Sequence, residues 1–117
     1  MTPRQGTADR RRELYRDALA VIARDYANDL QIDDVARAVA CSRRQMQRVF
    51  ADVGGTSFRE LLARARMCEA RRLLALQELQ IQEVAARVGY HQPAQFAKSF
   101  RRHYGIAPRT YRTRVLG

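Results

Sequence analysis

Apolar residues recur at helical spacing along most of the chain, and no stretch shows the alternation typical of a strand. Residues 32–39 carry one apolar helix face, with side chains at i, i+3, i+4 and i+7: Ile32, Val35, Ala36 and Val39. Residues 8–27 carry a similar stripe at Leu14, Ala18, Val21, Ile22 and Tyr26. This pattern predicts an all-α protein of about seven helices.

The pattern occurs twice. Adding 49 to the residue numbers maps the stretch Asp29–Ile32 onto Glu78–Ile81, and the same shift maps the apolar face onto Ile81, Val84, Ala85 and Val88. After one inserted residue the shift becomes 50, which pairs Phe50 with Phe100 and Gly55 with Gly105. An ordered set of matches of this kind indicates an internal duplication.

Each copy predicts a helix, a tight turn and a second helix. In the first copy the turn is Ala40–Ser42, where Ser42 is suited to cap the next helix. In the second copy the turn is Gly89–Tyr90, and Pro93 stands at the expected first helical position, where proline is tolerated.

A longer helix is expected between the copies. Ser57 and Glu60 have the spacing of a capping box at its start, and Thr56–Val88 contains no proline or glycine. Its apolar stripe is expected at Leu61, Leu62, Ala65, Cys68 and Leu73. The expected organisation is a disordered segment 1–7, a first lobe 8–55, a connecting helix 56–76 and a second lobe 77–117.

The charge of the chain points to a polyanionic partner. Lys and Arg number 22 against 12 Asp and Glu, which gives a net charge of +10, and Lys98 is the one lysine. A GC-rich genome would explain arginine in place of lysine, but it would not explain the surplus of positive charge. Arginine also matches phosphate groups and guanine edges in a bidentate manner. Double-stranded DNA is therefore the expected partner.

Other classes of site find little support. Cys41 and Cys68 form neither a CxxC pair nor a zinc-type cluster with histidine, so we expect reduced thiols, no metal and no cofactor. No nucleophile elbow or phosphate loop is present, so no enzyme activity is expected. No apolar run suits a membrane span or signal peptide, so no membrane association and a cytoplasmic, nucleoid-associated location are expected.

A helix, a short turn and a second helix form the helix-turn-helix pattern. The second copy carries the more diagnostic residues: Ile81, Val84, Ala85, Val88, Gly89, Tyr90, Phe96, Phe100, Gly105, Pro108, Tyr111 and Arg112. In this order they resemble the DNA-binding region of AraC/XylS regulators, and the resemblance extends from Leu14 to Arg114. It implies two helix-turn-helix subdomains bridged by a long helix, each presenting one recognition helix to the major groove.

Candidate base-reading residues follow from the helix faces. In the first recognition helix the face opposite Met46, Val49 and Phe50 carries Arg43, Arg44, Gln47 and Arg48. In the second, the outward residues are Ala94, Gln95 and Lys98, with His91 and Gln92 in the approaching turn. The resemblance implies base-facing positions for Arg44, Gln47, Arg48, Ala94, Gln95 and Lys98. A solvated helix start for Arg43 and Arg44, and a phosphate contact alone for Lys98, stay open.

Because alanine can contact only a thymine methyl, the first lobe is expected to supply most of the sequence specificity. The expected phosphate contacts are Ser42, Arg59, His91, Arg102, Arg109 and Arg112. Arg59 and Arg109 occupy corresponding places after the two glycines and are candidates either for phosphate clamps or for intramolecular salt bridges.

The sequence favours a transcriptional regulator that binds an asymmetric, bipartite DNA site as a monomer, with RNA polymerase as a candidate partner and no small-molecule pocket. The alternatives are a DNA-binding fragment of a larger effector-responsive regulator and a nonspecific nucleic-acid-binding protein.

Overall fold

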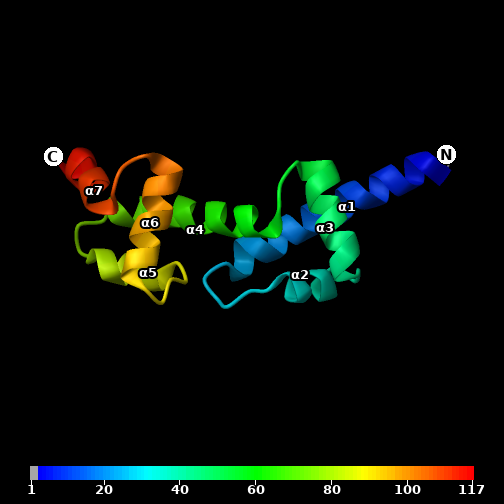
Figure 1. Ribbon diagram of the computed structural model, residues 1–117, viewed down its shortest axis with the longest axis horizontal. Helices are drawn as coiled ribbons and strands as arrows, with labels where there is room; N and C mark the ends of the chain where they lie inside the picture. The colour runs from blue at the N-terminus through cyan, green and yellow to red at the C-terminus, as the bar shows by residue number, and fades with distance from the viewer. Residues whose placement is uncertain (1–2) are drawn as a thin grey trace. The chain divides into compact units, whose positions relative to one another are not determined.

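The computed structural model describes residues 3–117, with side chains from residue 6 onward, and this range forms seven α-helices without a strand (Figure 1). The helices are α1 (Pro3–Asp25), α2 (Ile32–Ala38), α3 (Arg43–Gly54), α4 (Phe58–Leu74), α5 (Ile81–Arg87), α6 (Pro93–Tyr104) and α7 (Pro108–Leu116). The all-α prediction is confirmed. Within the described range, no helix is both long and apolar enough to cross a bilayer.

The chain divides into two compact units. The first unit comprises the chain up to Tyr26 and Leu30–Leu62; the second comprises Ala27–Asp29 and Ala63–Gly117. The helix α4 therefore begins in the first unit and continues into the second. Each unit contains one copy of the duplicated helix-turn-helix pattern.

In the first unit, α1 packs against both α2 and α3. The apolar faces predicted from the sequence meet here and are buried: Leu14, Ala18, Val21, Ile22, Val35, Ala36, Val39, Met46, Val49 and Phe50. The Tyr15 ring meets Phe50 edge-on at a centroid distance of 6.3 Å. This core fixes α3 on α1 and leaves the opposite face of α3 in solvent.

In the second unit, α6 packs against α5 and α7. Phe100 lies at the centre of an aromatic cluster, with ring centroids 4.8 Å from Tyr104, 5.6 Å from Tyr111 and 6.0 Å from Phe96. Phe96 and Phe100 are fully buried, so they belong to the core and provide no stacking platform for bases.

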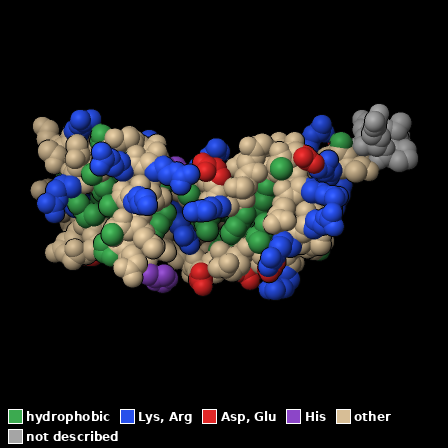
Figure 2. Space-filling model, in the orientation of Figure 1, with side chains coloured by type: hydrophobic (Ala, Val, Ile, Leu, Met, Phe, Trp, Pro, Cys, Tyr) green, Lys and Arg blue, Asp and Glu red, His purple; other side chains and the backbone are tan. Residues whose placement is uncertain are grey.

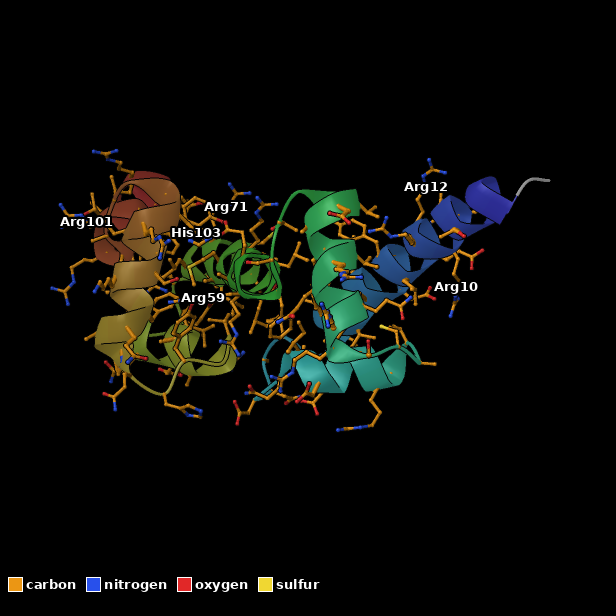
Figure 3. All side chains as sticks on the ribbon, turned by 45° about the vertical axis from the view of Figure 1, so that its right-hand side comes forward. Arg10, Arg12, Arg59, Arg71, Arg101 and His103 are labelled. Atoms are coloured by element: carbon orange, nitrogen blue, oxygen red, sulfur yellow. The ribbon has the colours of Figure 1, made fainter. Side chains whose placement is uncertain are left out.

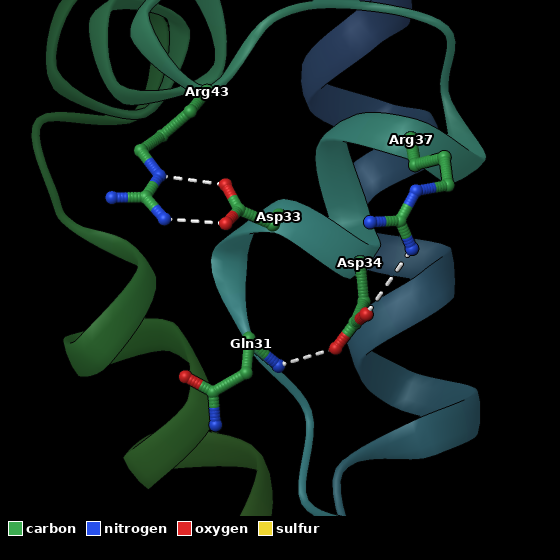
Figure 4. Close-up of polar contacts among 5 residues, drawn as sticks. All are labelled: Gln31, Asp33, Asp34, Arg37 and Arg43. Carbon is green, nitrogen blue, oxygen red and sulfur yellow. Dashed lines mark hydrogen bonds and ion pairs between the residues drawn. The ribbon is translucent and has the colours of Figure 1, made fainter.

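The duplication extends to the helix caps. At the start of α2 the backbone N–H of Gln31 donates to Asp34 Oδ2 at 2.8 Å (Figure 4), and at the start of α5 the N–H of Gln80 donates to Glu83 Oε1 at 3.2 Å. Each bond gives an otherwise unpaired N–H at a helix start an acceptor. The same local chemistry therefore begins the first helix of both copies.

The two turns also share one geometry. The second residue after the helix is left-handed in both, with φ of 59° at Ala40 and 96° at Gly89. The next residue, Cys41 or Tyr90, donates its N–H to the carbonyl five residues earlier at 2.9 Å. This is the Schellman arrangement, which satisfies the last carbonyls of a helix.

The helix α1 begins at Pro3; Met1 and Thr2 lie outside the described residues, and the disorder expected for 1–7 stays a prediction. The structure corrects the apolar stripe expected for the connecting helix. In α4 the buried side chains include Met67 and Ala70, whereas Cys68 is exposed. The buried face of α4 shifts because its two ends belong to different units.

Candidate nucleic-acid interface

The helix α3 is held by a cap at one end and a glycine at the other. Ser42 Oγ accepts a hydrogen bond from the backbone N–H of Gln45 at 3.1 Å, as expected for an N-cap. Gly55 ends the helix with a left-handed φ of 60°. Because Met46, Val49 and Phe50 are fully buried, the rotation of α3 about its axis is fixed.

The exposed face of α3 carries three polar side chains of the predicted reading set: Arg44, Gln47 and Arg48. Arginine can donate two hydrogen bonds to guanine and glutamine can pair with adenine, so this face has the donors needed for major-groove readout. The structure thus places on one helix the three residues for which the family resemblance implied base-facing positions.

Arg43 stands apart from this set because it is bound within the protein. Its Nε donates to Asp33 Oδ1 at 2.6 Å, and a second bond joins its terminal nitrogen to Asp33 Oδ2 (Figure 4). The hydrogen bond from Arg43 lowers the pKa of the Asp33 carboxyl below its ordinary value. The guanidinium of Arg43 therefore links the start of α3 to the start of α2, which differs from the expected base contact.

The helix α6 has a weaker reading face. Pro93 is its first residue, and the exposed positions include Ala94, Gln95 and Lys98. His91 and Gln92, in the turn before the helix, are also exposed. Gln95 and Lys98 can reach hydrogen-bond acceptors of bases or phosphates, whereas Ala94 offers only a methyl group.

Arg59 and Arg109 take equivalent places, each as the second residue of its helix, α4 and α7. Both side chains are exposed, and among the described residues neither has an acidic partner. Of the two alternatives left open by the sequence, this favours the phosphate clamp. Arg102 is exposed in the last turn of α6, on the same unit as Arg109.

Arg112 was expected to contact phosphate, but its guanidinium is used inside the second unit. Its Nε donates to the carbonyl of Leu74 at 2.9 Å, and its terminal nitrogen donates to the carbonyl of Leu76 at 3.3 Å. Leu74 is the last residue of α4, where its carbonyl has no helical N–H partner, and Leu76 lies in the segment that follows the helix. These bonds give Arg112 an intramolecular role that ties α7 to α4, and its contact with DNA phosphate stays a prediction.

Two arginines of α1 were missed from the sequence. Arg10 and Arg11 line an open groove beside α3, together with Arg44 and Arg48. Figure 2 shows Lys and Arg side chains on the face of the molecule over α1 and α3. A usable signal was present, because they precede the buried Leu14 by four and three residues and so continue the face of α1 that packs on α3.

Comparison with known proteins agrees with this arrangement. A family model described as a helix-turn-helix domain matches residues 35–114. The HTH-type transcriptional activator AarP of Providencia stuartii is 32% identical over 101 residues, which cover 86% of this chain and 75% of AarP. The lactose operon transcription activator of Staphylococcus xylosus is also 32% identical, but the chain spans only 34% of its length.

Solved structures give the same result. A transcriptional regulator from Chromobacterium violaceum, described by its AraC-type DNA-binding domain, superposes with a TM-score of 0.84 at 27% identity, covering 89% of this chain and 93% of that one. The DNA-binding domain of AdpA, solved in complex with a target DNA, superposes with a TM-score of 0.74 at 29% identity, covering 83% and 91%.

Proposed function

The chain belongs to the AraC-type helix-turn-helix family of DNA-binding transcriptional regulators, and we propose that it reads an asymmetric, bipartite site as a monomer. The observation that carries the proposal is the pair of recognition helices: α3 and α6 each bury an apolar face in its own unit and expose a polar one. One chain therefore holds two reading surfaces that differ in sequence. A dimer with two identical surfaces would instead favour a palindrome.

In this proposal α3 and α6 enter successive major grooves, which lie ~34 Å apart on one face of the duplex. Arg44, Gln47 and Arg48 read bases in one half-site; Gln95 and Lys98 contact the other. The site then spans about 20 bp. Arg59 and Arg109 hold the sugar–phosphate backbone, each from the first turn of a helix, where the helix dipole favours a negative charge.

The test is selection of bound duplexes from a random pool at ~150 mM salt, followed by the stoichiometry of the complex with the winning sequence. The proposal expects two different half-sites about one helical turn apart and one chain per duplex. Arg48→Ala should cost about 1–3 kcal/mol on that duplex and relax one base position of one half-site. Loss of affinity that is equal on random DNA would remove Arg48 from the base-reading set.

Arg12→Ala is a matched control, because it removes the same charge from the first unit at an exposed position that pairs with Asp9 at 3.0 Å. It should leave the selected motif unchanged. A wild-type protein that selects no motif, and whose affinity only collapses as salt rises, would instead be a nonspecific binder.

RNA polymerase is the second partner in this proposal, since a transcriptional regulator changes the rate of transcription by that enzyme. The selected site, placed upstream of a weak promoter, allows a direct test with purified polymerase. An increase in transcript that depends on Arg48 would support activation. A decrease confined to sites overlapping the promoter would support repression.

A further inference from the structure

An open groove of about 870 Å³ lies in the first unit between the beginning of α1 and one side of α3. Its lining comes from two segments, 6–11 and 42–52. The charged residues of the lining are Arg10, Arg11, Arg44, Arg48 and Asp52. Four arginines thus face one aspartate, and the groove suits an anion.

The single acidic group of the lining is already paired. Asp52 Oδ2 accepts a bond from Arg11 at 2.5 Å, which joins the third turn of α1 to the last turn of α3. This pair fixes the wall of the groove and uses the charge of Arg11. Arg10, Arg44 and Arg48 therefore supply the positive charge that is left, and none of them pairs with Asp52.

Arg10 is placed to bind an anion in the groove. Its side chain is 53% exposed and lies 3.6 Å from Glu13, a loose contact on the surface of the same helix. Its positive charge also acts on the Cys41 thiol in the turn that precedes α3. Figure 3 shows Arg10 and Arg12 leaving α1 on opposite sides, and of these two only Arg10 lines the groove.

We propose that the groove binds a backbone phosphate of the DNA, with Arg10 as its principal donor from α1. This inference rests on the proposed function, because Arg44 and Arg48 line both the groove and the base-reading face of α3. When α3 lies in a major groove, the sugar–phosphate strand that borders it passes beside the helix. The groove beside α3 is lined by positive charges and is open to solvent, so a continuous DNA strand can lie in it.

Arg10 is a positioning contact in this arrangement, since phosphate contacts fix the register of a protein on DNA and carry no sequence information. Removing it should weaken binding to all sequences alike. Each neutralised phosphate contributes about 0.9 to the slope of log affinity against log salt, so Arg10→Ala should make that slope shallower by about 0.9. Over a roughly fourfold rise in salt, the variant should lose about 3.5-fold less affinity than the wild type.

The experiment compares Arg10→Ala, Arg10→Lys and Arg12→Ala in salt titrations, on the selected duplex and on a random one. Thermal unfolding of each variant shows whether the first unit is intact. Phosphate ethylation interference on the selected duplex then locates the contact. Wild type and Arg10→Lys should be sensitive to ethylation of one phosphate bordering the α3 half-site, and Arg10→Ala should be insensitive there.

Three results separate the two proposals. Equal slopes for Arg10→Ala and Arg12→Ala, with no lost interference position, would overturn the groove contact and leave the bipartite reader standing. A shallower slope for Arg10→Ala on random duplex, with no selected motif for the wild type, would keep the phosphate contact and overturn the specific reader. If Arg10→Ala does not fold, Arg10→Gln replaces it, and a wild-type slope and interference pattern for Arg10→Gln would likewise overturn the groove contact.

Discussion

Ala40 is the one residue other than glycine with a positive φ in the described chain, and it occupies the turn of the first helix-turn-helix. Its φ of 59° lies in the left-handed region, where the β-carbon of an L-residue crowds the following carbonyl. The duplication places Gly89 at the same point of the second turn. Replacing Ala40 with glycine should therefore remove strain from the first turn while keeping its hydrogen bonds.

The size of the effect follows from two opposing terms. The left-handed conformation costs an alanine roughly 1–2 kcal/mol, which glycine avoids. Glycine also lowers the free energy of unfolding by about 0.4–1 kcal/mol, because the unfolded chain gains conformational freedom. Since the Ala40 side chain is exposed and contributes little packing, Ala40→Gly should raise the free energy of unfolding by about 0.5–1 kcal/mol. For a unit of this size that is a rise in Tm of about 3–6 °C.

The reverse change, Gly89→Ala, is the matched control. Gly89 has a φ of 96°, and an added β-carbon would lie 3.1 Å from the carbonyl oxygen of Ala27 and 3.2 Å from Arg66 Nε. The Arg66 guanidinium is itself occupied, since it donates to the carbonyl of Asn28 at 3.1 Å and stands over the Tyr90 ring. Strain and displacement act together, so this variant should lose about 2–3 kcal/mol.

Urea and thermal unfolding followed by circular dichroism measure both variants, with equal m-values as the check that each comparison concerns the native state. The change in the free energy of unfolding should have opposite signs at the two turns. A neutral or destabilising Ala40→Gly, alongside a strongly destabilising Gly89→Ala, would falsify the claim that the first turn stores backbone strain.

Three further predictions concern the surface of the protein. Arg109→Ala should weaken binding to every duplex alike and make the salt slope shallower by about 0.9, and an unchanged slope would show that Arg109 does not touch phosphate. Arg112→Ala should lower the free energy of unfolding by about 1–2 kcal/mol, because it removes charge-assisted bonds to the end of α4, while the salt slope stays as in the wild type; a shallower slope would restore Arg112 to the DNA contacts. Iodoacetamide should alkylate the exposed Cys68 before Cys41, because burial raises the pKa of the Cys41 thiol, and mass spectrometry that finds Cys41 modified first would contradict this.

The features that the sequence predicts well are those set by local chemistry and repeated twice. The apolar faces of α2 and α5, the Ser42 cap and the glycine ends of α3 and α6 follow from helical spacing and from backbone conformations that few residues adopt. The exposed faces of both recognition helices then follow, because burial of one side determines the other.

The sequence does not reveal a side chain's partner when that partner lies on another helix. Arg112 and Leu74 are joined across the second unit, and Arg43 finds Asp33 on the preceding helix. From the sequence alone, an arginine with such a partner cannot be distinguished from an arginine that binds phosphate. In α4 the stripe was misplaced at Cys68, because a single helix that serves two units buries different faces along its length.

The two copies of the duplicated pattern keep one scaffold but not one reading surface. Cap bonds, turn geometry and core positions coincide, because the same backbone hydrogen bonds and the same buried faces stabilise both units. The exposed faces carry no such constraint: α3 presents Arg44 and Arg48, whereas α6 presents Ala94 and Lys98 at its outward positions. Bidentate donors lie mainly on α3, and the arginine-lined groove adjoins the same helix. Under the proposed function, the first unit accordingly supplies most of the sequence discrimination, and the second adds affinity through its phosphate contacts.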